Sequence, residues 1–171
     1  MSEEKIMRQH FRAPWSSKLK GLTAAIVAIL AVAAYAAKGW ASMVMLGIVL
    51  IAAAFAIRGY SVVEGRLLIL RLGWATKYDL ARLSRVEISP GATMGSVRTM
   101  GIGGLFGFVG HYHNAILGSY KAYATNEFNT AVMVFGTETI VVTPDDPQEF
   151  VEAVTAASPA LSPAAADSTE E

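Results

Sequence analysis

One stretch of the sequence limits what this chain can fold into more than any other feature. Between residues 21 and 57 the only formal charge is Lys38, whereas charged residues recur every few positions on either side of the stretch. Its two parts, 21–37 and 40–57, are each close to the roughly 17–20 apolar residues that a membrane-spanning helix needs. Gly39 between them suits the tight turn of two antiparallel helices. The sequence therefore predicts a membrane protein with a two-helix transmembrane hairpin at residues 21–57.

The basic residues around the hairpin predict its orientation. Residues 1–57 hold six lysines and arginines against two glutamates, whereas residues 58–171 hold eight basic and twelve acidic residues. Five of the basic residues precede the first span, and Arg58 follows the second directly. Because basic residues are enriched on the cytoplasmic side of a membrane, we expect a multi-pass protein of the plasma membrane. Its basic N-terminal segment 1–20, its C-terminus and everything after the hairpin should lie in the cytoplasm.

Composition narrows the function classes. The chain has no cysteine, which excludes thiolate metal centres and disulfides, and its formal net charge is zero, so a nucleic-acid-binding domain is not indicated. The two spans contain no Asp, Glu, Arg or His, which argues against a proton relay or a self-contained transporter. A cleaved signal peptide is the rival interpretation of the first span, because Ala34-Tyr35-Ala36 resembles a cleavage site.

After residue 58 the apolar residues alternate with the period of strands. Asp146 followed by Pro147 and Glu149 then predicts the start of an amphipathic helix that ends near residue 157. Residues 158–171 are small, polar and acidic, and we expect them to be disordered. The expected fold is α+β, with residues 58–157 forming a small antiparallel β-barrel or sandwich that ends in a C-terminal α-helix. It contains about seven strands, at residues 60–63, 66–72, 74–80, 85–89, 119–125, 130–135 and 139–143.

Three sequence segments carry a family resemblance. They are Arg-Thr-Met-Gly-Ile-Gly-Gly-Leu-Phe-Gly-Phe-Val-Gly at 98–110, Leu-Gly-Ser-Tyr-Lys-Ala-Tyr-Ala-Thr at 117–125 and Val-Thr-Pro-Asp-Asp-Pro-Gln-Glu-Phe at 142–150. These resemble the glycine-rich segment, a strand and the helix start of bacterial pleckstrin-homology (PH)-like membrane proteins. The resemblance implies a PH-like domain at 58–157. It does not imply inositol-lipid binding, because the long basic loop of such domains is replaced here by Glu64-Gly65.

The glycine-rich segment is the main candidate for a contact surface. Its glycines do not fit a phosphate-binding loop, because no Lys-Ser/Thr pair follows and Phe106 stands where a dinucleotide motif needs glycine. Two interpretations stay open: a tight, partly buried loop or bulged strand, and a recognition loop that offers its phenylalanines to a partner or to lipid. The candidate partner- or lipid-binding residues are Arg98, Gly104, Phe106, Gly107, Phe108, His111, His113 and Lys121.

The remaining candidates have simpler interpretations beside the functional ones. His111 and His113 have a spacing that suits metal ligation on a strand, yet no further ligands are signalled, so we expect no metal site. Arg98 and Lys121 fit either a basic patch for anionic headgroups or a solvated strand face. No catalytic motif is present, and helix capping accounts for the acidic pair before Pro147. We therefore expect no catalytic residues and no cofactor.

The sequence as a whole favours a membrane-anchored, non-catalytic PH-like binding or scaffolding module. Its expected partners are the lipid bilayer and a membrane protein or a second copy of itself, and no nucleic acid. One alternative is an accessory subunit of a membrane enzyme or transporter complex that associates through the hairpin. A lipid-sensing module is a further alternative.

Overall fold

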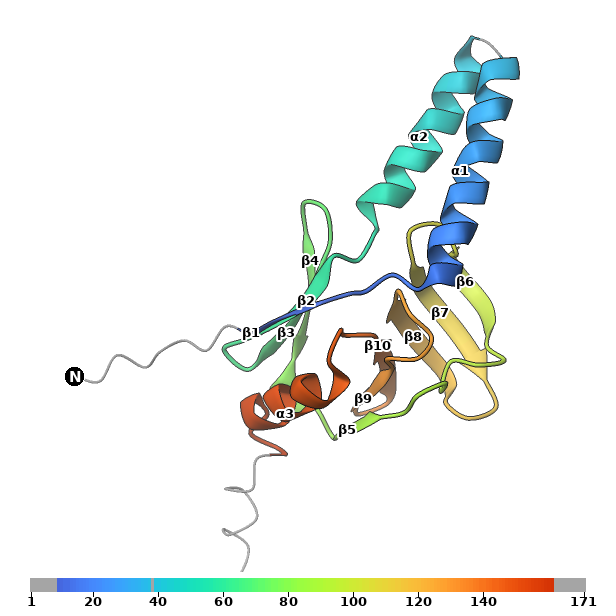
Figure 1. The fold of residues 1–171 in the computed structure, drawn as a ribbon. Helices are drawn as coiled ribbons and strands as arrows, with labels where there is room; N and C mark the ends of the chain where they lie inside the picture. The colour runs from blue at the N-terminus through green and yellow to red at the C-terminus, as the bar shows by residue number, and fades with distance from the viewer. Residues whose placement is uncertain (1–8, 38, 162–171) are drawn as a thin grey trace, which may run out of the picture.

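The computed structural model describes residues 9–37 and 39–161. Residues 1–8, Lys38 and residues 162–171 of the expected tail 158–171 lie outside the described residues. The first residues of that tail are ordered, contrary to the expectation, because Ser158 is fully buried and its hydroxyl donates to the Leu80 carbonyl at 2.9 Å. Two β-sheets face each other in the body of the molecule, the two apolar helices leave one end of it side by side, and a C-terminal helix lies near the other end (Figure 1).

The apolar stretch forms two helices, α1 (Ser17–Ala37) and α2 (Trp40–Ala54). Among the described residues, α1 is the one helix long and apolar enough to cross a membrane. The 15 residues of α2 span about 22 Å, less than a hydrocarbon core of about 30 Å. The structure thus supports the first predicted span and only in part the second. The second helix ends early because Ile57, which we expected inside it, is buried in the core of the β-sheet domain.

The first sheet contains four antiparallel strands, one of which was not predicted. That strand precedes α1 and pairs with the strand that follows α2, with Phe11 opposite Tyr60. The hairpin is therefore inserted between two neighbouring strands, and part of the segment 1–20 belongs to the domain. The strands, in spatial order, are β1 (Gln9–Arg12), β2 (Gly59–Val63), β3 (Arg66–Leu70) and β4 (Ala75–Asp79).

The second sheet has six strands in the order β5-β9-β10-β8-β7-β6. With it, the described residues form ten strands rather than about seven. Two of the additional strands occupy the glycine-rich segment. Contrary to the expected antiparallel sheet, β10 runs parallel to β8. β10 lies between β8 on one side and β9, with which it pairs antiparallel, on the other. The strands are β5 (Arg85–Ile88), β6 (Val97–Gly103), β7 (Phe108–Asn114), β8 (Gly118–Ala124), β9 (Ala131–Phe135) and β10 (Glu138–Val142), and a short 3₁₀ helix, η1 (Leu80–Arg82), precedes β5.

The main core lies between the sheets. Buried Tyr60 on β2 joins them, because its hydroxyl donates to the Tyr123 carbonyl at 2.6 Å and accepts from the Thr143 amide at 3.1 Å. Burial raises the pKa of this phenol to about 12, so it stays protonated and keeps both bonds at neutral pH. The bonds tie β2 of the first sheet to the ends of β8 and β10 in the second sheet.

The C-terminal helix α3 (Pro147–Ala157) closes this core as predicted. The Asp146 side chain accepts hydrogen bonds from the amides of Gln148 and Glu149, which confirms the predicted N-cap. Phe150 and Val154 are fully buried, and the Phe150 ring makes edge contacts with Phe11 and Tyr60. The helix thus seals the end of the sandwich that is distant from the hairpin (Figure 1).

Candidate binding site

The glycine-rich segment is a β-hairpin of β6 and β7. Gly101 lies opposite Gly110 at such close approach that a Cβ on Gly110 would collide with the Met100 carbonyl oxygen. Both glycines also have positive φ, 113° and 140°, where other residues are strained. The register shifts between Arg98 and Met100, so β6 carries a bulge. The repeated glycines are thus required by backbone geometry.

The tip of this hairpin lies against the base of α1. The Thr23 hydroxyl donates to the Gly104 carbonyl at 3.1 Å and accepts from the Phe106 amide at 3.1 Å. The Phe106 ring meets Trp15 edge-on, with centroids 6.0 Å apart. Gly104 and Gly107 are buried. The tip therefore braces the helical hairpin instead of standing free in solution.

The predicted candidate residues separate into three groups. Gly104, Phe106 and Gly107 form the brace described above. Phe108 lines a pocket on the outer face of the six-stranded sheet, and the register places Arg98 beside Tyr112 on that face. His111, His113 and Lys121 share the opposite face of the sheet.

Two of the three side chains on that opposite face, Lys121 and His113, have polar partners within the protein. Lys121 forms a 2.7 Å ion pair with Glu138, and this hydrogen bond raises the pKa of the lysine. The His113 Nδ1 lies 3.2 Å from the Ser119 hydroxyl. Among the described residues, no group of three or more histidine and acidic side chains is placed to hold a metal ion.

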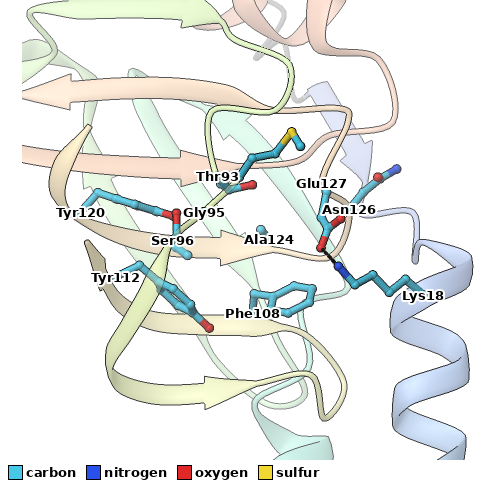
Figure 2. A pocket seen from close by; sticks show the side chains of 12 residues that line it. Lys18, Thr93, Gly95, Ser96, Phe108, Tyr112, Tyr120, Ala124, Asn126 and Glu127 are labelled. Carbon is cyan, nitrogen blue, oxygen red and sulfur yellow. Dashed lines mark hydrogen bonds and ion pairs between the residues drawn. The ribbon is translucent and has the colours of Figure 1, made fainter. Parts of the chain in front are cut away.

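The pocket on the outer face has a volume of about 310 Å³ (Figure 2). Its floor is made by β7 and β8, where Tyr112 and Tyr120 stack with centroids 6.0 Å apart, and where Ala122 and Ala124 leave a hollow beside Phe108. Residues 93–96, in the loop before β6, form one wall. The start of α1 contributes Lys18, whose amine pairs with Glu127 at 2.7 Å on the far side of the pocket from the tyrosines (Figure 2).

Side chains of the sheet hold the loop of the pocket in place. The Asn114 amide donates to the Ala92 carbonyl at 2.7 Å and to the Ser96 hydroxyl at 2.9 Å. The Tyr120 hydroxyl donates to the same Ser96 oxygen at 2.6 Å. Partial burial raises the pKa of both Tyr112 and Tyr120, so their phenols stay neutral. This pocket offers aromatic and apolar surface with a polar edge, which suits binding of an apolar or aromatic group.

Sequence reasoning missed this pocket. The signal that it left is the series Tyr120, Ala122 and Ala124 on one face of β8, in which the side chains become smaller toward the position opposite Phe108 of β7. The pocket needs in addition Lys18 and the loop residues, which are distant along the chain. Only Phe108 of the predicted candidates lines it.

The structure is a β-sandwich closed by a C-terminal helix, with an outer pocket lined by aromatic, small and polar side chains and by the Lys18–Glu127 ion pair. The family model of the bacterial PH domain matches residues 58–158, more than half of the chain. The chain belongs to this family, as the resemblance predicted. The comparisons with curated proteins and with solved structures give no match. The matched region begins at β2, so β1 and the helical hairpin are additions at its N-terminal side.

Proposed function

We propose that this chain is a membrane-anchored, non-catalytic binding module, with its helical hairpin inserted in the cytoplasmic membrane and its PH domain on the cytoplasmic face. The observation that carries the proposal is the exposure of the hairpin. Ile29 and Val32 on α1 and Met43 on α2 are 68–78% exposed, and most other large apolar residues of α2 also face outward. Such a continuous apolar surface is costly in water and favourable in lipid.

The position of the domain supports the cytoplasmic orientation. Lys18 and Lys20 stand in the first turn of α1, and Arg58 follows α2, so the basic residues gather where the hairpin meets the domain. Basic residues favour the cytoplasmic side of the spans that they flank. Fixing the domain at the bilayer in this way raises its effective concentration toward other membrane components without a further contact.

The outer pocket favours a ligand or partner contact at Phe108 over one at Phe106. Phe106 is already engaged by Trp15, whereas Phe108 shares the pocket with exposed Met94. The bound group that fits is an apolar or aromatic side chain or small molecule. We retain as a second candidate an association of the hairpin with another membrane protein, which the exposed side chains of α2 favour.

The test uses the absence of cysteine from the chain. Single cysteines are introduced at Ser42, near the turn of the hairpin, and at exposed Thr137 in the β9–β10 turn. In spheroplasts, an impermeant maleimide should label Ser42→Cys from outside and Thr137→Cys only after lysis. Both variants should stay in the membrane pellet after alkaline carbonate washing. Release by carbonate would contradict the anchor, and labelling of Thr137→Cys from outside would contradict the orientation.

A further inference from the structure

A second cavity lies beneath the helical hairpin, with a volume of about 480 Å³. It lies between the last turn of α2, the segment before α1 and the tip of the glycine-rich hairpin. Its apolar surface comes from residues such as Trp15, Ala53, Leu72 and Phe106, and Arg58 is the charged residue of its described lining. The cavity is therefore amphipathic and sits where the exposed apolar helices meet the polar domain.

A second arginine, Arg71, precedes the lining residue Leu72 and lies next to Arg58 across the paired strands, although it is not itself part of the described lining. The Arg58 amide donates to the Leu70 carbonyl at 2.9 Å, which continues the pairing of β2 and β3 and brings Arg58 next to Arg71. The Arg71 guanidinium carbon lies 5.4–5.9 Å from the ring centres of Phe55, Trp74 and Tyr123. These rings come from the end of α2, the β3–β4 turn and β8. Cation–π contacts with these three rings hold the Arg71 guanidinium at the base of the helical hairpin.

The hydrogen-bonding capacity of Arg71 is only partly used. One terminal nitrogen donates to the Thr76 hydroxyl at 2.9 Å, but the buried Nε has no partner among the described residues. Within the described part of the chain, no carboxylate forms an ion pair with Arg58 or Arg71. A buried N–H without an acceptor is costly. The described part of the protein provides no acceptor for the Arg71 Nε, so a ligand that supplies one would be favoured.

The two arginines and the apolar cavity together favour one kind of ligand. Guanidinium groups bind phosphate oxygens well because their N–H groups form a planar fork. The adjoining apolar cavity is continuous with helices whose side chains are exposed, as a lipid chain would require. A free anion would satisfy the arginines and leave the cavity empty, whereas a neutral lipid would leave the charges unpaired.

We propose that this cavity, with Arg58 and Arg71, binds one anionic phospholipid of the surrounding bilayer. The phosphate lies at the arginines, and an acyl chain lies in the cavity along Ala53 and Leu72. The inference rests on the proposed insertion of the hairpin. The lipid joins α2 to β3 at the membrane surface, and this is a site apart from the outer pocket near Phe108.

The test follows tryptophan fluorescence of the full chain in nanodiscs. The chain has three tryptophans, so Trp40→Phe with Trp74→Phe leaves Trp15 as the reporter in the cavity, and phenylalanine at position 74 keeps an aromatic ring beside Arg71. Phosphatidylglycerol brominated on its acyl chains is supplied as a minor component in phosphatidylcholine, and brominated phosphatidylcholine is supplied in the same way. We expect brominated phosphatidylglycerol to quench Trp15 with at least about fivefold preference over brominated phosphatidylcholine. A preference of about fivefold corresponds to the contribution of one basic residue at an anionic surface.

Matched variants test the two arginines. Arg58→Gln, at an exposed position, should reduce the preference about fivefold. Arg71→Lys keeps the charge but loses the planar fork, and should also weaken the preference. The control is Arg66→Gln, which removes an exposed arginine at the other end of β3. If Arg66→Gln has the same effect as Arg58→Gln, only general surface charge acts and the site is refuted.

Two further measurements separate the possible failures. A chain with Ile48→Trp as its single tryptophan reports on insertion of α2, because Ile48 is exposed near the middle of that helix. Quenching at position 48 without a lipid preference at Trp15 would overturn the lipid site and leave the anchor intact. No quenching at position 48 would overturn the anchor itself. Inorganic phosphate should compete with the lipid phosphate at the arginines and lower the preference more than chloride does at the same ionic strength. Equal loss of the preference in both salts would show charge screening alone and overturn the lipid site.

Discussion

Single residues fix the approach of the two strands in the glycine-rich hairpin. Gly110 is the clearest case, because an added Cβ would meet the backbone of Met100 and the φ of 140° already disfavours a side chain. Atoms of the backbone cannot move aside as a flexible side chain can. We therefore expect Gly110→Ala to lower the free energy of unfolding by about 1–3 kcal/mol, seen as a lower midpoint in thermal unfolding in detergent.

The matched control is Gly47→Ala on α2. A Cβ there meets nothing within 4 Å, and the residue is helical, so alanine should leave the stability unchanged or raise it slightly. Equal effects of the two alanines would show that close approach of the strands is not what the glycine provides.

At the scale of elements, Thr23 couples the glycine-rich hairpin to α1. Its hydroxyl both donates to Gly104 and accepts from Phe106, and the side chain is buried. Thr23→Val keeps the shape and removes both bonds, which leaves two backbone groups unsatisfied. We expect a loss of about 1–3 kcal/mol and faster hydrogen exchange at the Phe106 amide.

Thr137→Val is the control for this change, because Thr137 is exposed in a turn far from the brace. If the Phe106 amide keeps its protection in Thr23→Val, the tip is held by Trp15 packing and not by the threonine.

For the whole molecule, the segment before the hairpin completes the domain. Phe11 on β1 is 3% exposed and packs edge-on against Phe150 of α3, although the 38 residues of the helical hairpin, Ser17–Ala54, separate β1 from β2 along the chain. Phe11→Ala should cost about 3–5 kcal/mol, measured by denaturant unfolding. Neighbouring His10→Ala, at an exposed position on the same strand, should have little effect.

A chain beginning at residue 58 tests the same point. It contains the region matched to the family but lacks β1, so Tyr60 and Phe150 lose their cover from Phe11. We expect this shortened chain to be less stable than the full chain by an amount similar to Phe11→Ala. Equal stability of the shortened and full chains would mean that β1 is a dispensable addition.

The sequence by itself determined the elements whose signals are local. The charge-free stretch predicted the apolar helices, alternation predicted most strands, and Asp146-Pro147 predicted the start of α3. It missed β1, and for the glycine-rich segment it left a bulged strand open beside a tight loop without predicting the two strands β6 and β7. β1 is only four residues long, and β6 and β7 are rich in glycine, which has a low strand propensity, so neither pattern predicted a strand. Three characteristic segments were enough to indicate the family.

Only the tertiary structure decided where the candidate residues act. Phe106 and Phe108 are two positions apart, yet one braces α1 and the other lines the outer pocket. The sequence did not predict that β10 inserts beside β8, or that the pairing of β2 with β3 brings Arg58 next to Arg71. The physical reason is that residue periodicity records which face of an element is buried, whereas the contact between two elements depends on packing of the whole chain.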